Sequence, residues 1–133
     1  MKAVFADTFF FLAILNPSDH AHIAASRLSR SLVCPRITTA WVLTEVADAM
    51  ARTSNRHVFV GLLQLLERSS LVEVIPATQD LFERGVELYC SRLDKDWTLT
   101  DCVSFVVMQD EGLTDAMTGD RHFEQAGFRA LLK

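Results

Sequence analysis

Acidic residues end or interrupt four of the most apolar stretches of this 133-residue chain. These acids are Asp7, Glu45, Asp101 and Asp120. Asp7, for example, directly follows an apolar run at residues 3–6. Acids are seldom buried unless they are paired or bound to a metal, because desolvating an isolated charge is costly. Four acids at the ends of core elements therefore favour one cluster that holds a hard cation. Metal-assisted hydrolysis is the chemistry that such a cluster suits.

The composition fits one ordinary globular domain, and we expect residues 1–133 to form it. Half of the residues are hydrophobic, which is enough for a sizeable core. No apolar run reaches the roughly 18 residues of a membrane helix, and the first run lacks a signal-peptide cleavage site. We therefore expect no membrane segment and a cytoplasmic location. Three cysteines without a Cys-x-x-Cys pair agree with a reducing compartment.

The net charge of −4 argues against a protein that binds duplex DNA regardless of sequence, since such proteins carry a basic face. It does not exclude a nuclease, because the four acids alone account for the excess. The histidines His20, His22, His57 and His122 show no metal-ligand spacing. His20 and His22 diverge by about 200° on a helix and fit surface positions.

Apolar periodicity predicts strands that alternate with helices. The expected strands cover residues 2–6, 32–37, 71–75, 113–118 and 128–132. The expected helices cover residues 9–15, 19–28, 39–52, 55–66, 78–93, 98–111 and 123–126, with threonines as caps of several and Gly112 ending the sixth, for which Thr98 and Thr100 are alternative first residues. This alternation predicts an α/β fold with a central parallel β-sheet and α-helices on both faces. The first strand is short and wholly apolar, so we expect it at the centre of the sheet.

The four acids share one edge of this expected sheet. Asp7 and Asp120 follow predicted strands directly, and Glu45 and Asp101 lie in the first or second turn of helices that begin near the same edge. Ligands of parallel sheets bind beyond the carboxyl ends of the strands. We therefore expect the four carboxylates to converge there.

Each acid also fits a simpler structural role. Asp7 fits a helix cap, Asp101 fits a capping box with Thr98, Glu45 fits a solvated helix face, and Asp120 fits a turn. A capping role and a metal role are compatible, because a helix N-terminus favours the ionised carboxylate.

Four motifs in order give the chain a resemblance to a known family. They are Val-Phe-Ala-Asp-Thr at 4–8, Ile-Thr-Thr leading to Glu-Val at 37–46, Asp-Trp-Thr-Leu-Thr-Asp-Cys at 96–102 and Met-Thr-Gly-Asp-Arg-His-Phe at 117–123. On these motifs the chain resembles PIN-domain proteins, most of all the small VapC-type toxin ribonucleases, over nearly its whole length. The resemblance implies a PIN-like fold and an Mg²⁺- or Mn²⁺-dependent ribonuclease.

The resemblance also implies roles for particular residues. Asp7, Glu45, Asp101 and Asp120 would be the acidic metal ligands, with the fourth position the most variable in the family. Thr8, Asp96 and Thr118 would hold these ligands in position without binding the metal themselves. Lys95 and Arg121 are candidates to contact the substrate phosphate, and solvated surface charge is the alternative for both.

Two apolar segments raise the question of a partner. Phe9, Phe10 and Phe11 point about 100° apart on one helix, and residues 58–66 are apolar nearly all round. Such surface often marks an interface, although two layers of core would explain it equally well. In the resembled family it pairs the subunits into a homodimer and takes up a cognate antitoxin.

The sequence thus predicts a metal-dependent endoribonuclease, the toxin of a type II toxin–antitoxin pair that hydrolyses RNA phosphodiester bonds. The alternative is a non-catalytic PIN-like module that binds RNA or protein. A haloacid-dehalogenase-like phosphatase is disfavoured because Phe9 stands where it needs a second acid. A response-regulator receiver is disfavoured because its acidic pair and late lysine are not evident.

Overall fold

A computed structural model describes residues 2–133 and shows a five-stranded sheet in the order β3-β2-β1-β4-β5. The strands are β1 (Val4–Ala6), β2 (Arg36–Thr39), β3 (Val72–Ile75), β4 (Asp115–Met117) and β5 (Arg129–Ala130). Every neighbouring pair of strands is parallel. The predicted central position of β1 is confirmed, and its three residues are buried. None of the described helices is long and apolar enough to cross a membrane.

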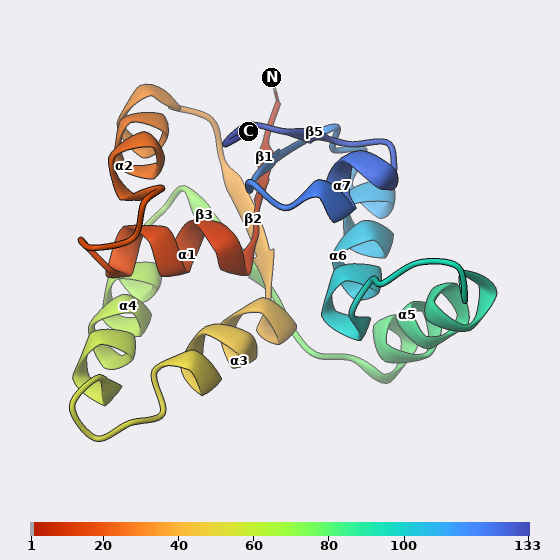
Figure 1. Ribbon diagram of the computed structural model, residues 1–133, viewed down its shortest axis with the longest axis horizontal. Helices are drawn as coiled ribbons and strands as arrows, with labels where there is room; N and C mark the ends of the chain where they lie inside the picture. Colours follow the sequence, from red (N-terminus) through yellow and green to blue (C-terminus); the bar gives the residue numbers. More distant parts are fainter. Residues whose placement is uncertain (1) are drawn as a thin grey trace.

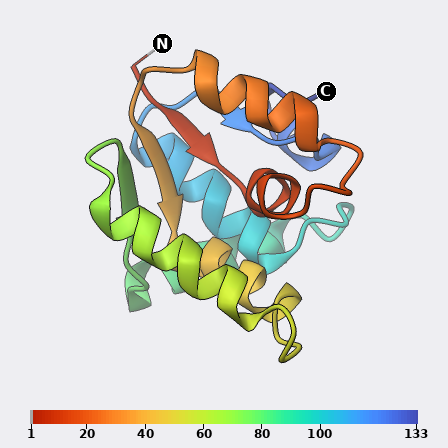
Figure 2. The ribbon, with the colours of Figure 1, turned by 90° about the vertical axis from the view of Figure 1, so that its left-hand side faces the viewer.

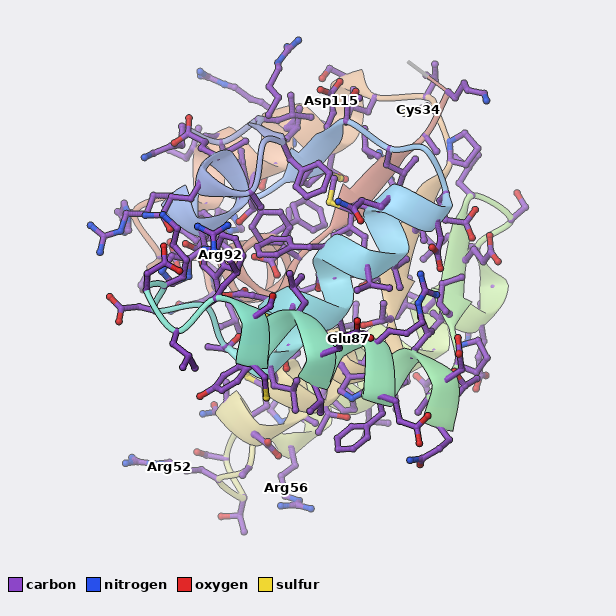
Figure 3. All side chains as sticks on the ribbon, turned by 90° about the vertical axis from the view of Figure 1, so that its right-hand side faces the viewer. Cys34, Arg52, Arg56, Glu87, Arg92 and Asp115 are labelled. Atoms are coloured by element: carbon purple, nitrogen blue, oxygen red, sulfur yellow. The ribbon has the colours of Figure 1, made fainter. Side chains whose placement is uncertain are left out.

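Helices cover both faces of the sheet, which confirms the predicted α/β class (Figure 1). On one face lie α1 (Thr8–Leu15), α2 (His22–Ser31) and α4 (Arg56–Arg68), seen in front of the strands in Figure 2. On the other face lie α5 (Gln79–Ser91) and α6 (Leu99–Asp110), seen in front in Figure 3. The remaining helices, α3 (Ala40–Ala49) and α7 (Arg121–Gln125), follow β2 and β4.

Threonine side chains start three of these helices, as the sequence predicts. The hydroxyl oxygens of Thr39, Thr78 and Thr98 each accept a backbone N–H from the first turn of the helix that follows. Such bonds satisfy amide groups that have no partner inside the helix. Gly112 ends α6 in the left-handed region with φ 66°, where glycine is favoured.

The predicted second strand is wrong in its position. Leu32 caps the C-terminus of α2, and β2 begins only at Arg36 and runs on through Thr39. Thr38 is fully buried, and its hydroxyl donates a 2.8 Å hydrogen bond to the carbonyl oxygen of Ala6 in β1. The polar residue Thr38 therefore fits a buried strand, because its hydroxyl has a hydrogen-bond partner there. The strands predicted at 113–118 and 128–132 are also shorter than expected.

Helix α6 lies between the sheet and α5, and it is buried continuously from Asp101 to Met108. Gly85 of α5 allows this close packing, since an added Cβ would lie 2.5 Å from a methyl carbon of Val103. Core packing thus helps to fix the N-terminus of α6, which carries Asp101.

The three consecutive phenylalanines all pack within the domain. Phe10 and Phe11 are buried, and the ring of Phe9 packs against the loop at Gly119. Helix α4 differs, because Val60, Leu63 and Leu65 remain exposed on it. Two layers of core therefore explain the phenylalanines, and α4 keeps apolar surface in contact with solvent.

Candidate active site

The candidate site lies at the point where the strand order of the sheet reverses. The chain builds outward from β1 to β2 and β3 on one side, and then to β4 and β5 on the other. In parallel sheets the crevice at such a point, beyond the carboxyl ends of the strands, is where ligands bind. Asp7 follows β1, and Asp120 follows β4 after two residues. The topology thus brings residues 113 positions apart in sequence to one edge.

Asp7 occupies the N-cap position of α1, but its side chain makes no capping hydrogen bond. Its carboxylate is almost completely buried, and Oδ2 accepts a 2.9 Å hydrogen bond from the hydroxyl of Thr118. Burial, with smaller contributions from the charges of Asp101 and Asp120, raises the pKa of Asp7 to about 7, while the Thr118 hydrogen bond acts in the opposite direction. In the absence of a metal, Asp7 therefore holds a proton below about pH 7, at a position where a bound cation would be favourable.

Asp101 combines a capping role with a place in the cluster. It forms a capping box with Thr98, in which Oδ2 accepts the Thr98 backbone N–H at 3.1 Å. The same Oδ2 lies 2.9 Å from Nδ1 of His122. Burial raises the pKa of Asp101, and the charge of Asp120 adds to that effect. The structural role predicted as an alternative is therefore present, and it is compatible with a role in the site.

Asp120 caps the short helix α7 through Oδ1, which accepts the backbone N–H of His122 at 2.9 Å. Its own backbone N–H donates to the Thr118 hydroxyl at 3.1 Å. One ligand atom from each of Asp101, Asp120 and His122 lies within 4.8 Å of the others. His122 is not among the site residues predicted from the sequence. The sequence feature that could have indicated His122 is its position two residues after Asp120, in the first turn of α7.

Glu45 reaches the site from the second turn of α3 and is half-buried. Its Oε1 accepts a 2.6 Å hydrogen bond from the hydroxyl of Thr8, the residue after Asp7. Glu45 stands outside the tight group of Asp101, Asp120 and His122, and it is connected to Asp7 through Thr8. The predicted supporting residues Thr8 and Thr118 therefore each hold one acid.

The other predicted residues make no polar side-chain contact with the four carboxylates in the part of the chain that the structure describes. Lys95 and Asp96 lie on the loop between α5 and α6 and line an open cleft of about 760 Å³ with Tyr89 and Thr98. Arg121 is exposed at the start of α7. Within residues 2–133, no side-chain hydrogen bond or ion pair joins Lys95, Asp96 or Arg121 to the acids.

The donors fit a hard divalent cation. Carboxylate oxygens dominate the group, and carboxylates suit Mg²⁺ and Mn²⁺, whereas thiolate-rich or imidazole-rich sets suit softer metals. The residue after Asp101, Cys102, is fully buried, and burial raises the pKa of its thiol to about 11.

Comparison with known proteins shows the family to which this fold belongs. The PIN domain family matches residues 4–129. The chain belongs to the PIN domain family. It is 30% identical over 125 residues to the 23S rRNA-specific endonuclease VapC20 of Mycobacterium tuberculosis, covering 94% of this chain and 95% of that protein. The crystal structure of that toxin, described as cleaving the sarcin–ricin loop, matches with a TM-score of 0.86.

Two more distant structures share the fold. FitAcB from Neisseria gonorrhoeae matches with a TM-score of 0.68 at 18% identity, covering 96% of this chain and 94% of its own. VapBC2 from Rickettsia felis, bound to a DNA fragment from its promoter, matches with a TM-score of 0.68 at 12% identity and covers 96% of both chains. At these identities the likeness extends to the fold alone.

Proposed function

We propose that this chain is a metal-dependent endoribonuclease that hydrolyses RNA phosphodiester bonds. The observation that carries the proposal is the meeting of Asp7, Asp101 and Asp120 at the strand-order reversal. Support comes from the match, over 94% of this chain, to a 23S rRNA-specific endonuclease. An acid cluster at this place suits phosphodiester hydrolysis, because charge on the phosphoryl group must be neutralised while water attacks.

Asp7, Asp101 and Asp120, with Glu45 beside them, would hold Mg²⁺ or Mn²⁺. When bound, such a cation lowers the pKa of a coordinated water and offsets charge on the phosphoryl oxygens. The protein's own contribution is orientation. Thr118 holds one oxygen of Asp7, Thr98 holds one oxygen of Asp101, and Thr8 holds one oxygen of Glu45. Fixed carboxylates cost little reorganisation when the cation binds.

The RNA strand would approach along the cleft between α5 and the loop that precedes α6. Thr98 lines this cleft and also bonds Asp101, so the cleft adjoins the site. Tyr89 is about half exposed in it and offers a face for stacking an unpaired base, while half-buried Lys95 offers a cation to a phosphate. Arg121, beside Asp120, would contact a second phosphate. Single-stranded or loop RNA suits such a groove better than duplex DNA.

We further propose that the chain is the toxin of a type II toxin–antitoxin pair and is silenced by a cognate antitoxin. The exposed apolar residues of α4 adjoin a pocket of about 270 Å³ that Phe10, Phe11 and Leu66 help to line. An amphipathic partner segment would cover such a surface. Residues 1–133 would act as one PIN-like domain in the cytoplasm and pair as a homodimer.

A cleavage assay tests the proposed activity. Purified protein stripped of metal is given ribosomal RNA with Mg²⁺, with Mn²⁺ or with neither, and the 5′ and 3′ ends are mapped. Cleavage should require the cation and fall at least about 100-fold in Asp101→Asn, which removes a charged ligand. The matched control is Glu87→Gln, an exposed acid on α5 (Figure 3), which should cleave like wild type.

The same variants separate the alternative function in cells. Expression of wild type and of Glu87→Gln should arrest growth, and expression of Asp101→Asn should not. If wild-type protein bound RNA but left it intact with every cation, the non-catalytic binding module would replace the nuclease.

A further inference from the structure

We infer that His122 is a positioning residue that fixes the carboxylate of Asp101 for cation binding. The inference rests on the proposed metal-dependent nuclease. His122 is not one of the four acids that the family resemblance implies as metal ligands. The evidence is the geometry of one oxygen atom, Oδ2 of Asp101.

Oδ2 of Asp101 meets two groups from different elements. The backbone N–H of Thr98 donates to it at 3.1 Å, and Nδ1 of His122 lies 2.9 Å from it. A carboxylate that binds a cation carries no hydrogen, so Nδ1 must be the donor. Two donors on one oxygen fix the rotation of the carboxyl group. Within residues 2–133, Oδ1 of Asp101 accepts no hydrogen bond, and it is therefore the oxygen left for a ligand.

The imidazole of His122 is itself held firmly. Its backbone N–H donates to Oδ1 of Asp120, and its side chain is only 18% exposed. The next residue, Phe123, is fully buried, and its ring packs edge-on against Phe105 with centroids 5.0 Å apart. Phe105 lies one turn after Asp101 on α6. The core contact between these two rings thus sets the distance from the imidazole to the carboxylate.

His122 could instead be a metal ligand, since it lies within 4.8 Å of two carboxylate ligand atoms. The bond to Asp101 excludes Nδ1 as the ligand atom, and the substitutions below test ligation through Nε2. Nδ1 lies at hydrogen-bond distance from Asp101 and 3.5 Å from Oδ1 of Asp120, so a cation on Nδ1 would break the bond to Asp101. Mg²⁺ also prefers oxygen ligands. An N–H held on Oδ2 of Asp101 orients that carboxylate while leaving its free oxygen to the cation.

Two substitutions at His122 separate the effect of losing the hydrogen-bond donor from the effect of losing the ring. His122→Asn keeps an amide N–H close to where Nδ1 lies and loses the ring, whereas His122→Phe keeps the ring and loses the donor. Mg²⁺ and Mn²⁺ affinities are measured by calorimetry without RNA, and kcat and KM are then measured with RNA. The Phe variant should bind both cations about 10–100-fold more weakly and lose kcat with KM for RNA unchanged. The Asn variant should stay within about threefold of wild type.

Three results would overturn the inference. One is unchanged cation affinity in His122→Phe. Another is an equal loss in both variants that is larger for Mn²⁺ than for Mg²⁺, which would make the ring a direct ligand. The third is wild-type protein that binds neither cation, whether or not it cleaves RNA. If the predicted affinities appear but wild type cleaves no RNA, the positioning role stands and the proposed nuclease falls.

A second measurement does not depend on any variant folding. Long-range ¹H–¹⁵N spectra of metal-free wild type at pH 8 report which ring nitrogen of His122 carries hydrogen. Hydrogen on Nδ1 is expected, and hydrogen on Nε2 alone would overturn the inference because Nδ1 would then have nothing to donate.

Discussion

The hydroxyl of Thr118 donates a 2.9 Å hydrogen bond to Oδ2 of Asp7, joining the end of β4 to the end of β1. Both residues are buried, and they lie 111 positions apart in the chain. The bond spans the point where the strand order reverses, which is where the candidate site lies. It therefore couples the fold of the sheet directly to the orientation of an acid.

Asp7→Asn should abolish RNA cleavage and stabilise the metal-free protein. The pKa of Asp7 is about 7 in the folded chain against an ordinary 3.8, so between these pH values the folded state holds a proton that the unfolded state has lost. Wild-type stability should therefore fall as pH rises from about 4 to about 7 and stay low above it. At pH 8 the Asn variant should be more stable by on the order of 4 kcal/mol.

Urea unfolding in EDTA across this pH range measures the difference. Saturating Mg²⁺ should remove the pH slope from wild type and leave the Asn variant unaffected, because the cation replaces the proton. Parallel pH profiles for the two proteins in EDTA would contradict the buried, protonated state of Asp7.

Thr118→Val should weaken the site while keeping the shape of the side chain. Asp7 loses a donor and the Asp120 backbone N–H loses an acceptor, so we expect a cost of about 1–3 kcal/mol and a further rise in the pKa of Asp7. Cation affinity should fall several-fold. The control is Thr114→Val at an exposed position before β4, which should unfold and bind like wild type. Equal behaviour of the two variants would remove Thr118 from the site.

Gly119→Ala should reduce cleavage although it replaces no acidic residue. An added Cβ would lie 2.6 Å from the Phe9 ring, so either the ring or the loop that carries Asp120 must shift. We expect at least a several-fold loss of kcat, and recovery when Phe9→Leu is added to make room. Gly61→Ala is the control, because a Cβ there meets nothing within 4 Å and should stabilise α4 by up to about 1 kcal/mol. Failure of Phe9→Leu to restore activity would contradict the steric explanation.

Lys95→Gln and Arg121→Gln should each raise KM for RNA several-fold with little change in kcat. Each removes one proposed phosphate contact, so the dependence of KM on salt should also become shallower. Lys2→Gln is the control, since Lys2 is exposed before β1, at the opposite edge of the sheet. If KM and its salt dependence were unchanged in both variants, these residues would be ordinary surface charges.

Much of this fold follows from local sequence. The helices capped by Thr39 and Thr78 begin where predicted, and the helix capped by Thr98 begins at the first of two threonines that were predicted as its start, because a hydroxyl before an apolar helix is a strong local signal. The central place of β1 follows from its fully apolar residues. The error at β2 has a non-local cause, since the Thr38 hydroxyl is satisfied by Ala6, 32 residues away. No local pattern shows that partner.

The candidate site divides in the same way. Asp7, Asp101 and Asp120 are visible in sequence because each follows or begins an apolar element. His122 is not, because its value lies in a 2.9 Å approach to Asp101 that only the packing of α7 on α6 creates. The convergence of the acids follows from the rule for parallel sheets, and the threonine donors Thr8, Thr98 and Thr118 were also predicted, whereas the contact from His122 depends on how α7 packs on α6.

The most direct test of the central claim is the position of a bound cation. Crystals grown with Mn²⁺ give an anomalous scattering signal that locates the ion independently of any assumed chemistry. Our account predicts the strongest peak among the carboxylates of Asp7, Asp101 and Asp120, with Oδ1 of Asp101 facing it. Absence of a peak there at millimolar Mn²⁺, or a strongest peak elsewhere on the protein, would contradict the account.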